Sequence, residues 1–141
     1  MSNLPLHYVD LRAFSYATED DKRVADALRT FVPDDMEIER ASTEGYHGDR
    51  IVVCSARVER ANGMGVVLDR LADLEGIETV IADLDERVGD NCAFFLTLSK
   101  GAAYRGEVAL GNGLTLRAKI EAYPANKEAA VSNLRALLAD L

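Results

Sequence analysis

The sequence contains little cysteine or proline, and it lacks tryptophan. It has two cysteines, three prolines and no tryptophan among 141 residues. Cys54 and Cys92 fall in apolar, strand-like runs without CxxC spacing, so we expect buried, reduced thiols rather than a disulfide or a metal site. No apolar run approaches the roughly 20 residues of a membrane span, and the first ten residues lack the regions of a signal peptide. We therefore expect a cytoplasmic protein with no membrane partner.

Catalytic motifs are also scarce. His7 and His47 are the two histidines, and no HExxH, GxSxG or P-loop pattern occurs. Residues 83–91 begin like a calcium loop, but Arg87 stands where the third oxygen ligand should be. We therefore expect no enzymatic activity, no cofactor and no metal, and we interpret His47 as a structural or surface residue.

Lysine is rare for a chain with this many charges. Only 4 of the 16 basic residues are lysines, and 24 acidic residues bring the net charge to −8. This composition is typical of adaptation to a salt-loaded cytoplasm, although an ordinary acidic protein is the alternative. At a screening length of about 3 Å, near 1 M salt, repulsion between an acidic protein and RNA is suppressed, so that stacking and arginine contacts decide binding.

The remaining pattern is that of a globular chain, with 48% hydrophobic residues and no linker or repeat. Period-two alternation predicts strands over 7–16 and 114–123, further strands are expected over 36–43 and 51–59, and the apolar run 92–99 predicts a wholly buried strand. A short strand over 107–110 is expected to join the strand over 114–123 through a hairpin at Asn112–Gly113. Helical spacing predicts helices over 17–33, 62–75, 77–88 and 125–141, the first capped by Thr18 and the second by Asn62, and a helical turn or loop over 100–106.

This order of elements indicates the fold class. Strands that alternate with period two favour a mostly antiparallel sheet with one face solvated and the other covered. We therefore predict an α+β two-layer sandwich, with helices on one face of the sheet, and a single domain over residues 1–141.

One candidate binding site is the uncovered face of that sheet. Alternation places aromatic and basic side chains together there, near Arg57; they are Tyr8, Arg12, Phe14, Tyr16, Arg117 and Lys119. Aromatic planes interleaved with cations are what single-stranded RNA needs, because each stacked base contributes about 1–3 kcal/mol. A solvated sheet face or a dimer interface is the alternative interpretation.

A second candidate site is a pair of glycine-containing segments, 43–50 and 99–106. They carry Arg50, Lys100 and Arg105, and backbone N–H groups together with such cations can hold a phosphate. Plain loop geometry is the alternative. The residues expected to shape these loops are Gly45, Gly48, Gly101 and Gly106.

Four ordered motifs carry a resemblance that extends from His7 to Pro124. They are ATEDDKRVADAL (17–28), STEGYHGDRIVV (42–53), LDERVGDN (84–91) and LSKGAAYRGEVAL (98–110). Together they resemble an archaeal family described as a small RNA-binding domain and predicted exosome subunit, with this chain as a haloarchaeal-type member. The resemblance implies association with RNA but no reaction, and a fold similar to the 5S-RNA-binding ribosomal protein of the large subunit.

Two sets of positions carry over from that family. The first is Thr43, Glu44, Gly45, Gly48 and Arg50, and the second is Lys100, Ala102, Ala103, Tyr104 and Gly106. The chain departs from the family at Asp49–Arg50, where Asn-Pro is common, and at Ser99, where an acidic residue is usual. The first change adds a carboxylate beside the phosphate site, and the second is expected to free Lys100 from a salt-bridge partner.

The sequence thus predicts a non-enzymatic RNA-binding protein, associated with the exosome or with ribosomal RNA. Arg50, Lys100 and Arg105 would contact phosphates. The expected partners are RNA, exosome or ribosome-associated proteins, and a second copy of the chain. The alternative is a scaffold subunit that acts through homodimerisation or docking without touching RNA. A metal-dependent hydrolase is disfavoured, because a helix would place Asp83 and Glu86 on one face and Asp85 elsewhere.

Overall fold

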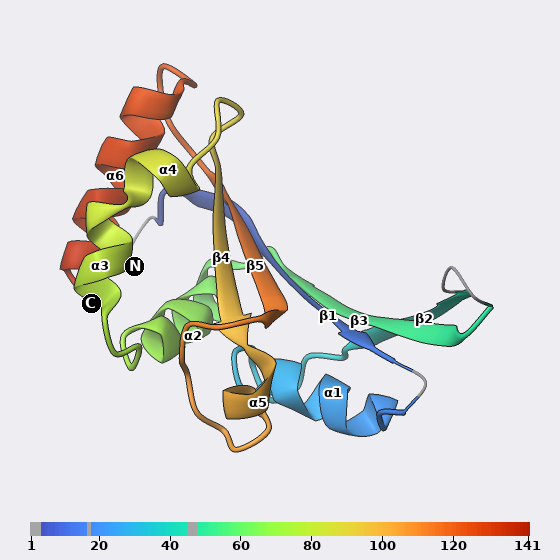
Figure 1. The fold of residues 1–141 in the computed structure, drawn as a ribbon. Coiled ribbons are helices and arrows are strands. Elements are labelled where there is room, and N and C mark those ends of the chain that lie inside the picture. The colour runs from blue at the N-terminus through green and yellow to red at the C-terminus, as the bar shows by residue number, and fades with distance from the viewer. Residues whose placement is uncertain (1–3, 17, 45–47) are drawn as a thin grey trace.

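A computed structural model describes residues 4–16, 18–44 and 48–141 (Figure 1). Its strands are β1 (Leu6–Ser15), β2 (Glu39–Glu44), β3 (Arg50–Val58), β4 (Ala93–Ser99) and β5 (Gly113–Ile120). Its helices are α1 (Asp21–Arg29), α2 (Ala61–Leu71), α3 (Ile77–Ala82), α4 (Leu84–Arg87), α5 (Lys100–Ala103) and α6 (Lys127–Ala139).

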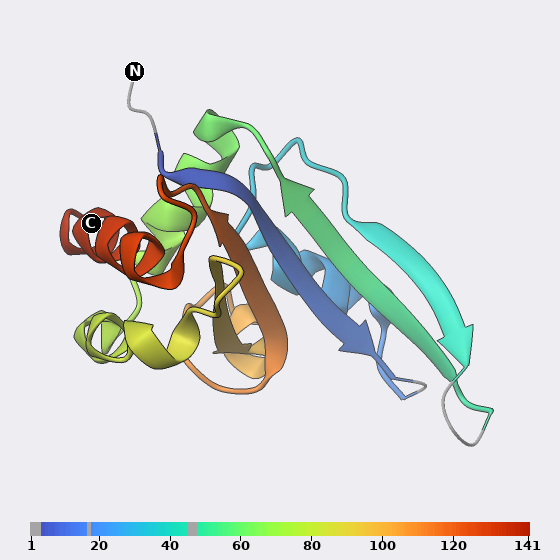
Figure 2. The same ribbon diagram turned by 90° about the horizontal axis from the view of Figure 1, so that it is seen from above.

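The strands form one antiparallel sheet in the order β2-β3-β1-β5-β4. At its centre, Leu11 of β1 lies opposite Ala56 of β3 and Leu116 of β5. The helices pack along one side of this twisted sheet, at the left and bottom of Figure 1, and the other side is open (Figures 1 and 2). The predicted α+β architecture, with helices on one face, is therefore confirmed.

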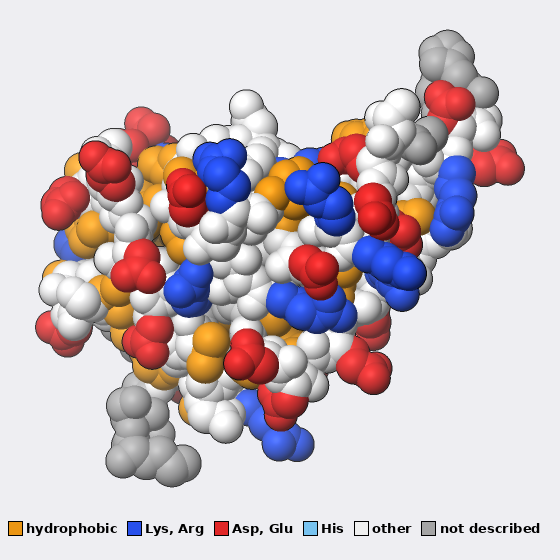
Figure 3. Space-filling view, turned by 90° about the horizontal axis from the view of Figure 1, so that it is seen from below, with side chains coloured by type: hydrophobic (Ala, Val, Ile, Leu, Met, Phe, Trp, Pro, Cys, Tyr) orange, Lys and Arg blue, Asp and Glu red, His pale blue; other side chains and the backbone are white. Residues whose placement is uncertain are grey.

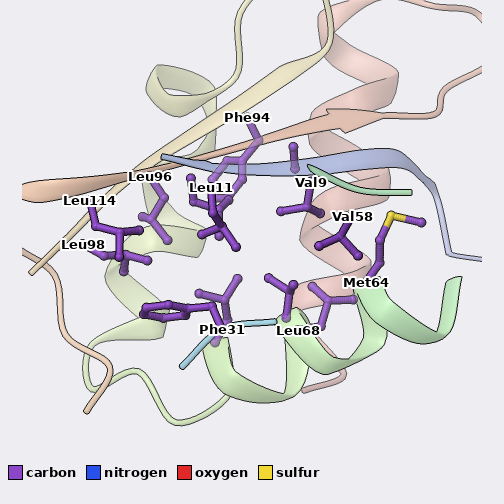
Figure 4. Packing of buried hydrophobic residues seen from close by; sticks show 14 of the residues in the cluster. Val9, Leu11, Phe31, Val58, Met64, Leu68, Phe94, Leu96, Leu98 and Leu114 are labelled. Atoms are coloured by element: carbon purple, nitrogen blue, oxygen red, sulfur yellow. The ribbon is translucent and has the colours of Figure 1, made fainter. Parts of the chain in front are cut away.

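The core lies between the sheet and the helices. Figure 4 shows Val9 and Leu11 pointing from β1 toward Phe31, which follows α1, and toward Leu68 of α2. Leu11 and Phe31 are both fully buried. Burial of each such side chain contributes about 1.5–3 kcal/mol, so these contacts fix which face of the sheet remains free.

The first helix begins later than the sequence predicts. Asp20, not Thr18, is the N-cap, and its carboxylate accepts a hydrogen bond from the Lys22 N–H at 2.9 Å. The preceding residue, Glu19, accepts instead from the Tyr16 N–H at 3.1 Å, so the chain turns before the helix starts.

Two other helix predictions need correction. Arg60 rather than Asn62 is the N-cap of α2, and Asn62 lies inside the first turn, where its side-chain Oδ1 accepts a hydrogen bond from the neighbouring Gly63 N–H. The helix predicted over 77–88 is two short helices, since the backbone at Asp83 leaves helical geometry at φ −98° and ψ 12°.

The predicted strand over 107–110 and its hairpin at Asn112–Gly113 are wrong. β5 pairs with β4, and a single bridge joins Leu110 to Leu98 on the other edge of β4. Gly111 and Gly113 allow the chain here to pass close to Ser99 and Lys100 at the start of α5. A Cβ at Gly113 would lie 2.8 Å from Lys100 Cβ, and its φ of +104° also favours glycine.

The described residues also bear on the expectations for cysteines, membrane spans and metal sites. Cys54 and Cys92 are buried and form no disulfide, as predicted. Among the described residues, no helix is long and apolar enough to cross a bilayer. Within the same residues, no three His, Cys, Asp or Glu side chains gather in a way that would hold a metal ion.

Candidate nucleic-acid interface

The helix-free side of the sheet is hollowed, and we call it the concave face. Its hollow has a volume of about 720 Å³ and is lined by side chains from all five strands. Along two neighbouring strands the outward residues alternate with buried ones. On β1 these are Tyr8, Asp10, Arg12 and Phe14, and on β5 they are Thr115, Arg117 and Lys119.

Three arginines lie over aromatic rings on this face. The distance from guanidinium carbon to ring centroid is 4.1 Å for Arg57 over Tyr8, 5.7 Å for Arg12 over Phe14 and 5.8 Å for Arg117 over Phe95. Paired planes and cations of this kind bind single strands through stacking and charge. The structure thus brings Tyr8, Arg12, Phe14 and Arg117 together as the sequence predicts.

The aromatic rings are open to ligands. Phe14, Tyr16 and Phe95 are 38%, 53% and 46% exposed, although isolated aromatic rings favour burial. Phe14 and Tyr16 lie 6.4 Å apart between ring centroids. Phe95 is absent from the predicted site because residues 92–99 were interpreted as a wholly buried strand. Period-two alternation could have placed Phe95 on the open face, because adjacent residues of a strand point to opposite faces and Phe94 is only 2% exposed.

The charges of the concave face differ in their partners. Arg57 donates from Nε and NH2 to the two carboxylate oxygens of Asp10, at 2.7 and 2.9 Å. Arg12 and Arg117 form no ion pair with any carboxylate of the described residues. Lys119 donates from Nζ to the carbonyl of Asn91. Arg12 and Arg117 are therefore the cations best placed to meet an anionic ligand.

Acidic side chains border the same hollow. Glu37, Glu39 and Glu59 line it on the side of β2 and β3. A polyanion would be repelled there, so that contact with phosphate is favoured on the β1, β5 and β4 side, where Arg12, Arg117 and Phe95 lie.

Lys100 lies beside the end of β1 and is not free. Its ammonium is 2.9 Å from Glu19 Oε2 and donates to the Phe14 carbonyl oxygen at 2.9 Å, and the side chain is only 14% exposed. The expectation that Ser99 frees Lys100 is therefore wrong, because Glu19 supplies the carboxylate. Ser99 itself caps α5, its hydroxyl oxygen accepting from the Ala102 N–H at 3.0 Å.

Glu19 is the centre of a small polar network. Its carboxylate also accepts from the Tyr104 hydroxyl at 2.9 Å. Burial opposes its charge, but hydrogen bonds from Lys100, Tyr16 N–H and Tyr104 outweigh this, so the pKa of Glu19 lies below its ordinary value. Burial and the bond to Glu19 raise the pKa of Tyr104 to about 12.

The described residues of the two glycine-containing segments do not form a common site. Arg50 lies at the end of the β2–β3 hairpin, opposite Glu44, and Arg105 follows α5, where it donates to Glu107 at 3.2 Å. Figure 1 shows α5 well apart from the start of β3, where Arg50 lies. Each segment therefore presents its arginine separately.

The predicted loop-shaping glycines differ in what they do. Gly48 and Gly106 have φ of +80° and +73°, which favours glycine. Gly101 lies in α5 with room for a side chain, so its backbone does not require glycine. Gly45 and His47 lie outside the described residues.

The side of the molecule seen in Figure 3 carries charges of both signs. There, Lys and Arg side chains alternate with Asp and Glu over the helices, without a large area of one sign. The concave face therefore remains the stronger candidate for binding an anionic strand.

Comparison with known proteins agrees on one family. A family model for RNA binding matches residues 8–121. The chain is 33% identical over 143 residues to an RNA-binding protein of Pyrococcus abyssi, covering 94% of this chain and 93% of that protein. It is 30% identical over 117 residues to an uncharacterized protein of Methanocaldococcus jannaschii, covering 77% and 78% of the two chains.

A solved structure extends this agreement to the fold. A DUF54 protein of Methanothermobacter thermautotrophicus is 34% identical and superimposes with a TM-score of 0.80, covering 94% of this chain and 98% of that one. Sequence and structure thus match over nearly the whole chain, and the protein belongs to this RNA-binding family.

Proposed function

We propose that this protein binds single-stranded RNA on its concave face and carries out no reaction on it. Bases stack on Phe14, Tyr16, Tyr8 and Phe95, while Arg12 and Arg117 meet the phosphates. Membership of the RNA-binding family supports the ligand class. The three arginine–ring pairs on an uncovered, hollowed sheet face are the observation that carries the choice of surface.

The remaining predicted cations have lesser parts in this proposal. Arg50 and Arg105 lie away from the hollow and would contact the RNA backbone beyond it. Lys119 adds positive charge at the edge of the face, although its ammonium is already bonded to a carbonyl. Binding would then depend chiefly on stacking, which suits a chain of net charge −8 in a salt-loaded cytoplasm.

A salt series of RNA binding tests this function. Fluorescence anisotropy with a labelled oligouridine of about 12 nucleotides should give a measurable Kd from about 0.2 M to about 2 M KCl, because stacking survives salt. Phe14→Ala and Tyr16→Ala should weaken binding at every salt concentration, and Arg12→Ala chiefly at low salt. If the wild-type protein gives no anisotropy change at any salt concentration, the function is wrong.

We propose further that the RNA is part of a larger assembly, such as the exosome or the ribosome. The family resemblance motivates this step. Affinity purification with and without nuclease separates the cases. Partners that disappear on RNA digestion would be bound through RNA, and partners that remain would be bound through protein.

A scaffold role has one structural observation in its favour. All six residues of β2 are exposed, and no described strand pairs with its outer edge. Such an edge adds strands from other chains. Light scattering that shows a dimer, together with the absence of RNA binding, would favour this second function.

A further inference from the structure

We propose that Glu19, Lys100 and Tyr104 form a positioning network that holds Phe14 and Tyr16 in place to stack on bases. This inference rests on the proposed RNA binding. It concerns how Phe14 and Tyr16, which we call the aromatic platform, are held in position. Lys100 contacts Phe14 and Tyr16, Glu19 contacts Tyr16, and Tyr104 is joined to them through its hydrogen bond to Glu19. Lys100 and Tyr104 belong to one segment, and Glu19 lies 81 residues before Lys100.

The need for the network arises where a strand ends. β1 pairs with β3 as far as Ser15, but its pairing with β5 stops at Ala13. The Phe14 carbonyl therefore lies beyond the last β5 partner, and Lys100 Nζ donates to it at 2.9 Å. The Lys100 side chain thus supplies the hydrogen bond that a residue of β5 would otherwise donate, and it holds the end of β1 in place.

Tyr16 is held by the same groups. Glu19 Oε1 accepts from the Tyr16 N–H at 3.1 Å, and the Glu19 N–H donates to the Tyr16 carbonyl at 2.8 Å. The Lys100 ammonium lies 5.4 Å from the centroid of the Tyr16 ring, where a cation is attracted to the ring. Backbone and ring of Tyr16 are therefore both fixed.

Tyr104 completes the network from α5. Its hydroxyl donates to Glu19 Oε2 at 2.9 Å, and the guanidinium of Arg23 covers its ring at 5.1 Å. Gly113 allows this arrangement, since a Cβ there would meet Lys100 Cβ at 2.8 Å. The segment Lys100–Tyr104 is therefore shaped to reach β1 rather than to face solvent.

The hydrogen bonds of Lys100 leave no room for a phosphate. An ammonium has three N–H donors, and Lys100 Nζ lies 2.9 Å from the Phe14 carbonyl, 3.0 Å from Glu19 Oε1 and 2.9 Å from Glu19 Oε2. A phosphate contact would require breaking one of these. Lys100 is therefore a positioning residue, acting on RNA through Phe14 and Tyr16.

Removal of the Glu19 side chain tests the network, because it should change the RNA affinity in the direction opposite to that expected from charge alone. Loss of an acidic residue normally strengthens binding to RNA, whereas Glu19→Ala should weaken binding of the oligouridine about tenfold, because two stacking rings lose their support. The control is Glu75→Ala, which removes the same charge from an exposed position between α2 and α3 and should change the Kd by less than about twofold.

Two further variants keep the test valid if Glu19→Ala unfolds. Tyr104→Phe retains the ring and should weaken binding severalfold while circular dichroism stays unchanged. Lys100→Ala should weaken binding with no change in the slope of log K against log salt, whereas loss of a phosphate contact would reduce that slope by about 0.7.

The outcomes separate this inference from the proposed function. Weaker binding by folded Glu19→Ala or Tyr104→Phe, with an unchanged salt slope for Lys100→Ala, supports the network. If the wild-type protein binds RNA and the folded variants bind it as tightly, the network is overturned and the proposed function stands. A smaller salt slope for Lys100→Ala likewise overturns the network alone. A wild-type protein that binds no oligouridine overturns both.

Discussion

Asp10 lies between two arginines on neighbouring strands, opposite Arg57 of β3 and opposite Arg117 of β5. It accepts both hydrogen bonds of the Arg57 fork, and this hydrogen bonding raises the pKa of Arg57. Arg57 is thereby held over the Tyr8 ring, and Arg117 keeps its charge available. The carboxylate organises the cations of the concave face but also reduces its positive charge.

Asp10→Asn should therefore strengthen RNA binding. The change removes one negative charge between two arginines, and we expect a Kd about three- to tenfold lower at about 0.1 M salt, with the gain lost near 1 M. The midpoint of thermal unfolding should change little, because the pair is exposed. Glu75→Gln is the matched charge control. Equal or weaker binding by Asp10→Asn would contradict a role of this face in contacting phosphate.

The neighbours Phe94 and Phe95 should separate stability from binding. Phe94 is buried in the core, so Phe94→Ala should lower the free energy of unfolding by about 3–5 kcal/mol. Phe95 is 46% exposed on the opposite side of the same strand, so Phe95→Ala should cost less than about 1 kcal/mol and weaken RNA binding. Urea unfolding and anisotropy measure the two quantities. A Phe95→Ala protein with unchanged affinity would remove this ring from the site.

Gly113 and Gly65 should respond in opposite ways to alanine. At Gly113 the added Cβ meets Lys100 and the φ is positive, so Gly113→Ala should destabilise by about 1–3 kcal/mol. At Gly65, inside α2, nothing lies within 4 Å of the added Cβ, so Gly65→Ala should stabilise by about 0.5–1 kcal/mol. Chemical denaturation of the two variants checks both signs, and a neutral Gly113→Ala would argue against close contact with Lys100.

Tyr104 should titrate late. Its pKa of about 12 in the folded protein lies above the ordinary value of 10.0, so the folded state retains this proton longer than the unfolded chain. The stabilising contribution is thus complete below pH 10 and is lost as the pH rises through 12. Tyrosinate absorbance in the near ultraviolet should show a late step that Tyr104→Phe removes and Glu19→Gln shifts to lower pH. If the late step persists in Tyr104→Phe, it belongs to another residue.

Much of the sheet was predictable because its strands alternate. In β5 the side chains from Leu114 to Ile120 point alternately inward and outward as the sequence indicates. Hydrophobic period alone sets the faces of such a strand, so Tyr8, Arg12, Phe14 and Arg117 could be assigned to one surface without a structure.

The rest depended on distant contacts. Glycine near Asn112 predicts a turn from local preference, but here Gly113 is needed because Lys100 comes close. The ion pair between Lys100 and Glu19 joins residues 81 positions apart, and no local pattern signals it. For the same reason, the sequence predicts that Lys100 binds phosphate, whereas in the structure its ammonium is bonded to Glu19 and to the Phe14 carbonyl.

The spacing of Phe14 and Tyr16 constrains the shape of any strand that uses both. The pleat advances about 6.6–6.8 Å for every two residues, and the ring centroids are 6.4 Å apart. Bases within a stacked helical strand are only about 3.4 Å apart. If RNA stacks on both rings as we propose, its consecutive bases must lie farther apart than in a helical strand, so the spacing of Phe14 and Tyr16 favours an extended RNA strand.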